Sequence, residues 1–273
     1  MHPLNHVITY LPSFNLYVDS TAELAPFGSL PDTILDKPTV LTATGTIGHT
    51  PKMKAEDHTV KSEISMAMRE DGSVSGESIS HMTGSLEIDS RGSRYNDQQT
   101  GQEIVVRNLF FRFNEIGDGK LSYTDPTNFD EVYKVQASFE MERIVDTSRA
   151  GAFRLPVGLA PGRIAGYTTY KPIAARRFPY VCDSHTDVDK TRFTLPSNLQ
   201  ITQLPEDVLF DDGELRFTSH YRQDQQQVLV ERRLVVQYPS RVCTPDQHAN
   251  WKELIAVMRA DQQAMVMFRV TGK

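Results

Sequence analysis

The clearest indication of the fold class is the segment Leu215-Arg216-Phe217-Thr218-Ser219-His220-Tyr221-Arg222. Apolar or small side chains alternate in it with charged and polar ones, and this period of two is typical of a half-buried β-strand. A partner run follows from Val228 to Tyr238. The two runs predict antiparallel sheets that have one face on a core and the other face in water.

The same period recurs elsewhere, and a helical period appears twice. Apolar and polar side chains alternate over residues 133–142 and over residues 60–69. The second of these runs is followed by Asp71-Gly72, a typical hairpin turn. A last strand is expected over 264–270. Two helices are expected where apolar residues are spaced i, i+3, i+4, i+7, at Val106, Leu109, Phe110, Phe113 and at Trp251, Leu254, Ile255, Met258. The second helix has a capping box, with Thr244 as the cap, Pro245 first and Gln247 third.

These patterns predict a mainly β fold of the α+β type with a few helices. Two stretches rich in Pro and Gly, 25–38 and 156–166, suggest boundaries. We therefore expect an opening hairpin segment at 1–38, a middle α+β block at 39–160, and a C-terminal β-sandwich-like block with one helix at 161–273.

Composition excludes several classes of function. The chain has 273 residues and a formal net charge of -6, which argues against broad binding to the phosphate backbone of nucleic acids. No apolar run approaches the roughly 20 residues of a membrane helix. The sequence has neither a Gly-rich phosphate loop nor a Gly-x-Ser-x-Gly elbow, and we predict no cofactor. Residues 1–4 lack the features of a signal peptide, and we expect the sequence to be cut from a longer protein.

The densest chemical signal lies in residues 5–21. Two short strands flank a turn at 11–14, and if Tyr10 faces Asn15 across it, His6 faces Asp19. Directly opposed side chains share a face, with Cβ atoms about 4.5–5.5 Å apart. A carboxylate at this distance fixes the tautomer of an imidazole and stabilises the imidazolium. The spacing therefore predicts the base and its orienting partner, which are two of the three members of a nucleophilic triad.

The segment resembles the His-to-Asp hairpin of transglutaminase-like cysteine enzymes, with His6 followed by Asp19-Ser20-Thr21. More of the chain resembles large bacterial proteins that place a domain of unknown function before a transglutaminase-like core and a β-rich region after it. The resembling residues are Asn5-His6-Val7, Tyr10-Leu11-Pro12, Leu16 to Thr21, Phe27 to Pro31, Phe178-Pro179-Tyr180, Thr194-Leu195-Pro196, Leu204-Pro205, Tyr238-Pro239 and the Trp251 helix ending near Asp261-Gln262.

The resemblance implies that residues 1–38 are the C-terminal hairpin of a transglutaminase-like core, with His6 as general base and Asp19 as its orienter. It also implies a bacterial periplasmic or cell-envelope setting. In that superfamily the nucleophilic Cys lies upstream, and only five residues precede His6 here. The site is therefore incomplete, and the chain is expected to be inactive alone.

The expected function is the C-terminal part of a transglutaminase-like, thiol-dependent amide hydrolase or acyltransferase. Its expected partners are the upstream part of the same protein and a peptide or protein substrate. The alternative is a non-catalytic β-sandwich binding or interaction module, since this architecture hosts many binding roles. An exposed edge at Val7 to Leu11 also predicts dimerisation through the N-terminal strand.

Two further groups leave alternatives open. Cys182 and Cys243 either form a disulfide, which would imply an oxidising compartment, or are two buried thiols, and Cys243 precedes a helix start where a thiol can be activated. Asp183, His185, Asp187 and Asp189 share one strand face and suit either a divalent cation or the wet face of a strand or a loop. No metal site is predicted, because no second cluster completes the coordination.

Overall fold

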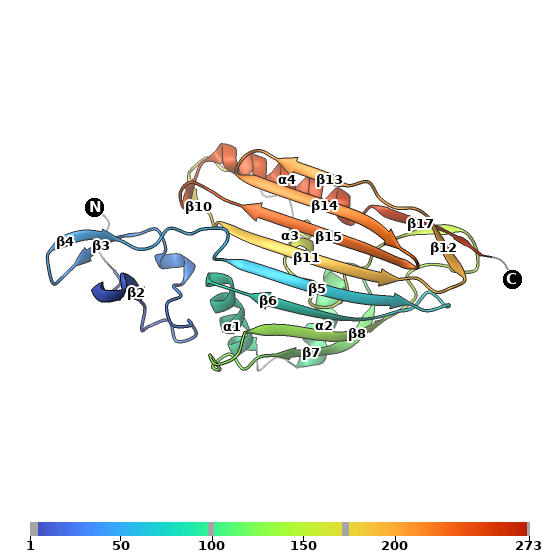
Figure 1. Ribbon diagram of the computed structural model, residues 1–273, viewed down its shortest axis with the longest axis horizontal. Helices are drawn as coiled ribbons and strands as arrows, with labels where there is room; N and C mark the ends of the chain where they lie inside the picture. Colours follow the sequence, from blue (N-terminus) through green and yellow to red (C-terminus); the bar gives the residue numbers. More distant parts are fainter. Residues whose placement is uncertain (1–4, 98–100, 171–174, 272–273) are drawn as a thin grey trace.

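The computed structural model describes residues 5–97, 101–170 and 175–271, and its centre is one large sheet. Figure 1 shows the eight strands side by side. Their order is β13 (Val208–Asp211), β14 (Leu215–Asp224), β15 (Gln227–Val236), β11 (His185–Thr194), β5 (Thr59–Met68), β6 (Val74–Met82), β8 (Lys134–Met141) and β7 (Gly117–Tyr123). The mainly β fold with few helices is confirmed.

The prediction of antiparallel sheets alone was wrong, because β5 and β11 pair in parallel. A parallel pair needs a long crossover, and residues 69–184 provide it. The sheet draws strands from both sides of the boundary predicted after residue 160, so the middle and C-terminal blocks share one sheet. Their division into separate units stays a prediction.

One face of the sheet is buried and the other is open, as the alternation predicts. Along β5, Ile64, Met66 and Met68 are buried while Glu63 and Ser65 are exposed. The buried side packs on a three-stranded sheet of β12 (Leu199–Gln203), β17 (Met265–Val270) and β9 (Gly151–Arg154). Two stacked sheets therefore enclose the larger hydrophobic core.

Helices cover the rest of that face. Figure 1 shows α2 (Gln102–Arg112), α3 (Ile164–Thr168) and α4 (Pro245–Gln262) behind the large sheet. Both predicted helices are present as α2 and α4, and α4 begins with the predicted capping box at Thr244. No helix in the described part of the chain is long and apolar enough to cross a membrane.

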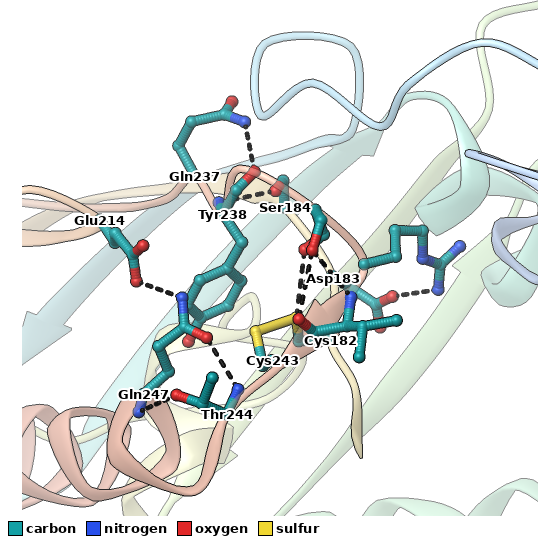
Figure 2. Close-up of a disulfide and its surroundings, with 12 residues drawn as sticks. Cys182, Asp183, Ser184, Glu214, Gln237, Tyr238, Cys243, Thr244 and Gln247 are labelled. Carbon is teal, nitrogen blue, oxygen red and sulfur yellow. Dashed lines mark hydrogen bonds and ion pairs between the residues drawn. A yellow bond between two sulfur atoms is a disulfide. The ribbon is translucent and has the colours of Figure 1, made fainter. Parts of the chain in front are cut away.

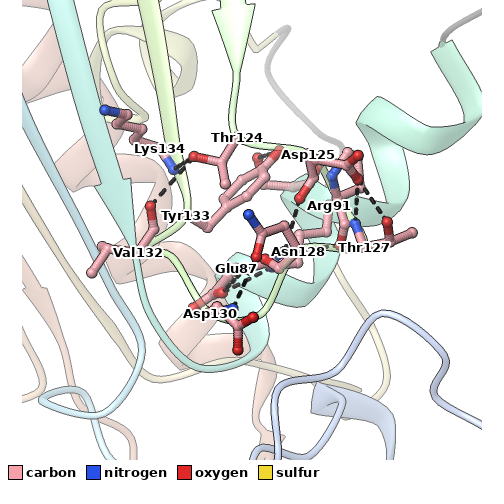
Figure 3. A network of polar contacts seen from close by, with 12 residues as sticks. Glu87, Arg91, Thr124, Asp125, Thr127, Asn128, Asp130, Val132, Tyr133 and Lys134 are labelled. Atoms are coloured by element: carbon pink, nitrogen blue, oxygen red, sulfur yellow. Dashed lines mark hydrogen bonds and ion pairs between the residues drawn. The ribbon is translucent and has the colours of Figure 1, made fainter.

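Helix α1 (Ser85–Asp97) was not predicted, because its sequence has no apolar stripe. It is held by Arg91, whose side chain is 1% exposed. The guanidinium donates to the backbone carbonyls of Pro126 and Asn128 at 2.8 and 3.0 Å, and pairs with Glu87. Figure 3 shows this network, in which a buried cation replaces the apolar contacts that usually anchor a helix.

The described residues before β5 project beyond one end of the large sheet (Figure 1). They contain the hairpin of β1 (Thr9–Leu11) and β2 (Leu16–Val18) and the pair β3 (Pro38–Leu41) and β4 (Thr46–His49). A small core of Tyr17, Leu30, Leu35 and Met53 holds them together. Asp32 joins this projection to the C-terminal part through an ion pair with Arg241 at 3.3 Å.

Candidate functional site

The opening hairpin has the predicted strands but a different register. The pairs are Thr9 with Val18, Tyr10 with Tyr17 and Leu11 with Leu16. The prediction that Tyr10 faces Asn15 was wrong because Asn15 belongs to the loop. There it adopts a left-handed conformation with φ 47° and its N–H donates to the Pro12 carbonyl. The four-residue loop is therefore 12–15 and not 11–14.

His6 and Asp19 meet despite this shift. His6 Nε2 lies 3.0 Å from Asp19 Oδ2. Continuing the observed register would place Asp19 opposite Ile8, so His6 reaches it along the diagonal, which a long side chain can span. The other carboxylate oxygen of Asp19 accepts from the Thr21 N–H at 2.9 Å and the Thr21 hydroxyl at 2.7 Å. Thr21 thus fixes one oxygen and leaves the other for the imidazole.

The electrostatics of the pair favour an ionised carboxylate. Burial acts to raise the pKa of Asp19, but hydrogen bonds from Thr21 and His6 outweigh it, so the pKa lies below its usual value. The Asp19 side chain is 4% exposed and that of His6 is 37% exposed. Because Asp19 holds Nε2, Nδ1 is the ring nitrogen left to exchange a proton with another group.

The cysteines do not complete this site, because Cys182 and Cys243 form a disulfide. Cys243 is the last residue of β16 (Val242–Cys243), and Cys182 directly follows β10 (Tyr180–Val181), the strand that pairs with β16. Figure 2 shows the bridge directly before the capping residue of α4, Thr244. The alternatives of two buried thiols and of a nucleophile at Cys243 are therefore wrong, and the chain has no free thiol for His6.

The acidic run of β11 is buried, and the expectation of a wet face was wrong. His185, Asp187 and Asp189 are 6%, 0% and 5% exposed, because α3 packs against β11 and the strands β15 and β5 flank it on either side. Asp183 precedes the strand and is exposed. No cluster of three or more metal-ligating side chains is found in the described part of the chain.

Sequence reasoning missed the partners of this run. Tyr167 contacts His185 and Asp187, and Arg163 lies 3.8 Å from Asp187. Both belong to the turn into α3 or to α3 itself, within or just after the stretch that the sequence suggested as a boundary. No local signal identifies them, since only the packing of α3 on β11 brings them to the strand.

Comparisons with known proteins match part of the chain. A family model described as "Domain of Unknown Function with solved-structure structure (DUF3858)" matches residues 152–268. No curated protein matches. The crystal structure of a putative protease from Parabacteroides distasonis is similar at 11% identity and a TM-score of 0.36, over 45% of this chain and 24% of that one. The chain therefore spans about a quarter of the length of that protein.

Proposed function

We propose that the chain is the C-terminal part of a transglutaminase-like, thiol-dependent amide hydrolase or acyltransferase, in which His6 is the general base and Asp19 positions it. The observation that supports this most directly is the 3.0 Å contact between His6 Nε2 and Asp19 Oδ2, with the second carboxylate oxygen fixed by Thr21. In this proposal the thiol comes from a part of the protein outside this chain.

The proposed reaction uses the two ring nitrogens in different ways. Nδ1 of His6 takes the proton of the thiol, and the thiolate attacks the carbonyl carbon of an amide. The imidazolium returns that proton to the leaving amine, and a thioester remains. Water or a second amine then attacks the thioester and releases the thiol. Throughout, the Asp19 carboxylate keeps Nε2–H in place and stabilises the imidazolium.

The test uses the complete native gene product and measures the rate at which iodoacetamide alkylates its thiol at pH 6. A thiol paired with an imidazolium is largely thiolate at this pH, whereas an ordinary thiol with a pKa of about 8.5 is not. His6→Ala should therefore slow alkylation on the order of 100-fold. Asp19→Asn, which keeps the acceptor for Thr21, should slow it less.

A matched control comes from the open face of the sheet. His220 and Asp207 form a second pair of this kind, with Nδ1 and Oδ2 2.9 Å apart, and both side chains are exposed. His220→Ala should leave the alkylation rate unchanged. Equal rates for wild type and His6→Ala would overturn the proposal and favour the alternative of a non-catalytic binding module.

A further inference from the structure

A pocket of about 280 Å³ lies where α2, β9 and α4 end, and it shares no residue with the His6–Asp19 hairpin. Each of these elements contributes one arginine to its lining. Arg112 is the last residue of α2, Arg154 is the last of β9, and Arg259 lies in the last turn of α4. We propose that this pocket binds a tetrahedral dianion, the phosphate or sulfate group of a free anion or of a small ester, on the three arginines. The proposal is independent of the proposed function.

Two of the arginines are fixed against one short segment, residues 166–170, which runs from the end of α3 into the following turn. Arg112 donates from Nε to the Thr169 hydroxyl at 2.9 Å and from Nη2 to the Gly166 carbonyl at 3.2 Å. Arg259 donates from Nε and Nη2 to two other carbonyls of the segment, at 3.0 and 2.9 Å. The segment therefore holds two like charges on the same pocket in set orientations.

No carboxylate balances these two charges. Within the described residues, Arg112 and Arg259 hydrogen-bond only to neutral oxygens, and neither forms an ion pair. The C-terminal end of a helix carries at most about half a negative charge, so the ends of α2, α3 and α4 together offset at most about half of the charge of the three arginines. Like charges held near one another repel, and an anion between them would relieve that repulsion.

One carboxyl group, that of Glu115, does line the pocket, and it is already engaged elsewhere. Its two oxygens accept from the backbone N–H groups of Val157 and Gly158 at 2.6 and 3.0 Å. Burial raises the pKa of Glu115 to about 7, although these hydrogen bonds and the charge of Arg154 act to lower it. Glu115 is therefore only partly ionised at pH 7, and the pocket keeps a net positive charge.

The lining also keeps hydrogen-bond donors in reserve. A guanidinium group has five N–H donors. Arg112 and Arg259 each make two hydrogen bonds, and Arg154 makes a single long one, of 3.4 Å, to a backbone carbonyl. The side-chain amides of Gln262 and Gln263 line the same pocket and have no hydrogen-bond partner within the described residues. The planar fork of arginine matches paired oxygens of phosphate or sulfate, and several such forks suit a dianion better than a carboxylate.

The volume admits more than the anion itself. A cavity of about 150 Å³ holds a benzene molecule, so a pocket of about 280 Å³ has room for a tetrahedral anion and a small organic body. Phe113 and Leu155 supply apolar lining against which such a body can pack. A free anion and an ester therefore share one mode of recognition and differ in how much of the pocket they fill.

The test is isothermal titration calorimetry of the 273-residue chain with phenyl phosphate, sodium sulfate and sodium benzoate, each at pH 7 and at one ionic strength set with sodium chloride. We expect saturable binding of both dianions at one site per chain, and binding of benzoate at least 10-fold weaker than that of phenyl phosphate. Tighter binding of phenyl phosphate than of sulfate assigns the site to an ester, and equal binding assigns it to the free anion. Absence of saturable binding for both dianions, or benzoate binding as tight as phenyl phosphate, would overturn the proposal.

Arg154→Gln locates the site, and because Arg154 is exposed and makes one long hydrogen bond, the variant is expected to fold. It should weaken the binding of both dianions at least 10-fold. Arg233→Gln removes the same charge from the open face of the sheet on β15 and should leave both affinities unchanged. Equal affinities for wild type and Arg154→Gln, or equal losses in the two variants, would overturn the proposal. Circular dichroism of each variant checks that its fold is intact.

Discussion

Loss of the Cys182–Cys243 bridge should destabilise the chain by about 4 kcal/mol. The bridge joins residues 61 apart in sequence, and closing a loop of that length removes about 4 kcal/mol of chain entropy from the unfolded state. The strand pairing beside it, that of β10 with β16, has two residue pairs. Little backbone structure therefore replaces the constraint when the bridge is absent.

The assay is urea unfolding of wild type and of the double variant Cys182→Ala, Cys243→Ala, each with and without dithiothreitol, followed by far-ultraviolet circular dichroism. The free energy of unfolding should fall by about 4 kcal/mol in the double variant and by a similar amount in reduced wild type. Dithiothreitol should not affect the double variant, which is the internal control. A fall below about 1 kcal/mol in both would show that the bridge does not stabilise the chain through loop closure.

Three other changes test the packing. Arg91→Ala leaves buried carbonyls without their donor and should cost about 3 kcal/mol or more in urea unfolding; an unchanged midpoint would contradict this. Burial raises the pKa of Glu115 to about 7, so its contribution to the free energy of unfolding falls as pH rises from about 4.5 to 7. The fall is at most about 3 kcal/mol, and Glu115→Gln should remove it between pH 5 and 8. Gly162→Ala should lower the melting temperature more than Gly213→Ala, because both have positive φ but only the first new Cβ meets other side chains; equal shifts would contradict the packing.

The sequence predicted the positions of the strands better than the pairing between them. Alternation located β5, β8, β14 and β15 because a half-buried strand must show a period of two. The period says which face a residue occupies and nothing about which strand lies beside it. The parallel pair of β5 with β11 was therefore beyond it, as was the burial of Asp187 on β11. Because β5 and β11 pair across the boundary predicted after residue 160, we expect residues 59–271 to unfold in one transition.

The sequence likewise predicted only part of the candidate site. His6 and Asp19 were predictable because a short loop confines them to one hairpin, and the diagonal reach of His6 tolerated the wrong register. The pocket that Tyr167, His185 and Asp89 line was not predictable, since its residues come from three elements that only tertiary packing brings together.

The proposed function requires a thiol supplied from outside this chain. The most direct measurement treats a lysate of the source cells with biotinylated iodoacetamide without reductant, precipitates the protein with an antiserum to this chain, and blots for biotin. We expect a labelled band well above 30.8 kDa, the mass of this chain, because the two cysteines of the chain are bonded to each other. A band at 30.8 kDa that takes the label only after reduction would contradict it.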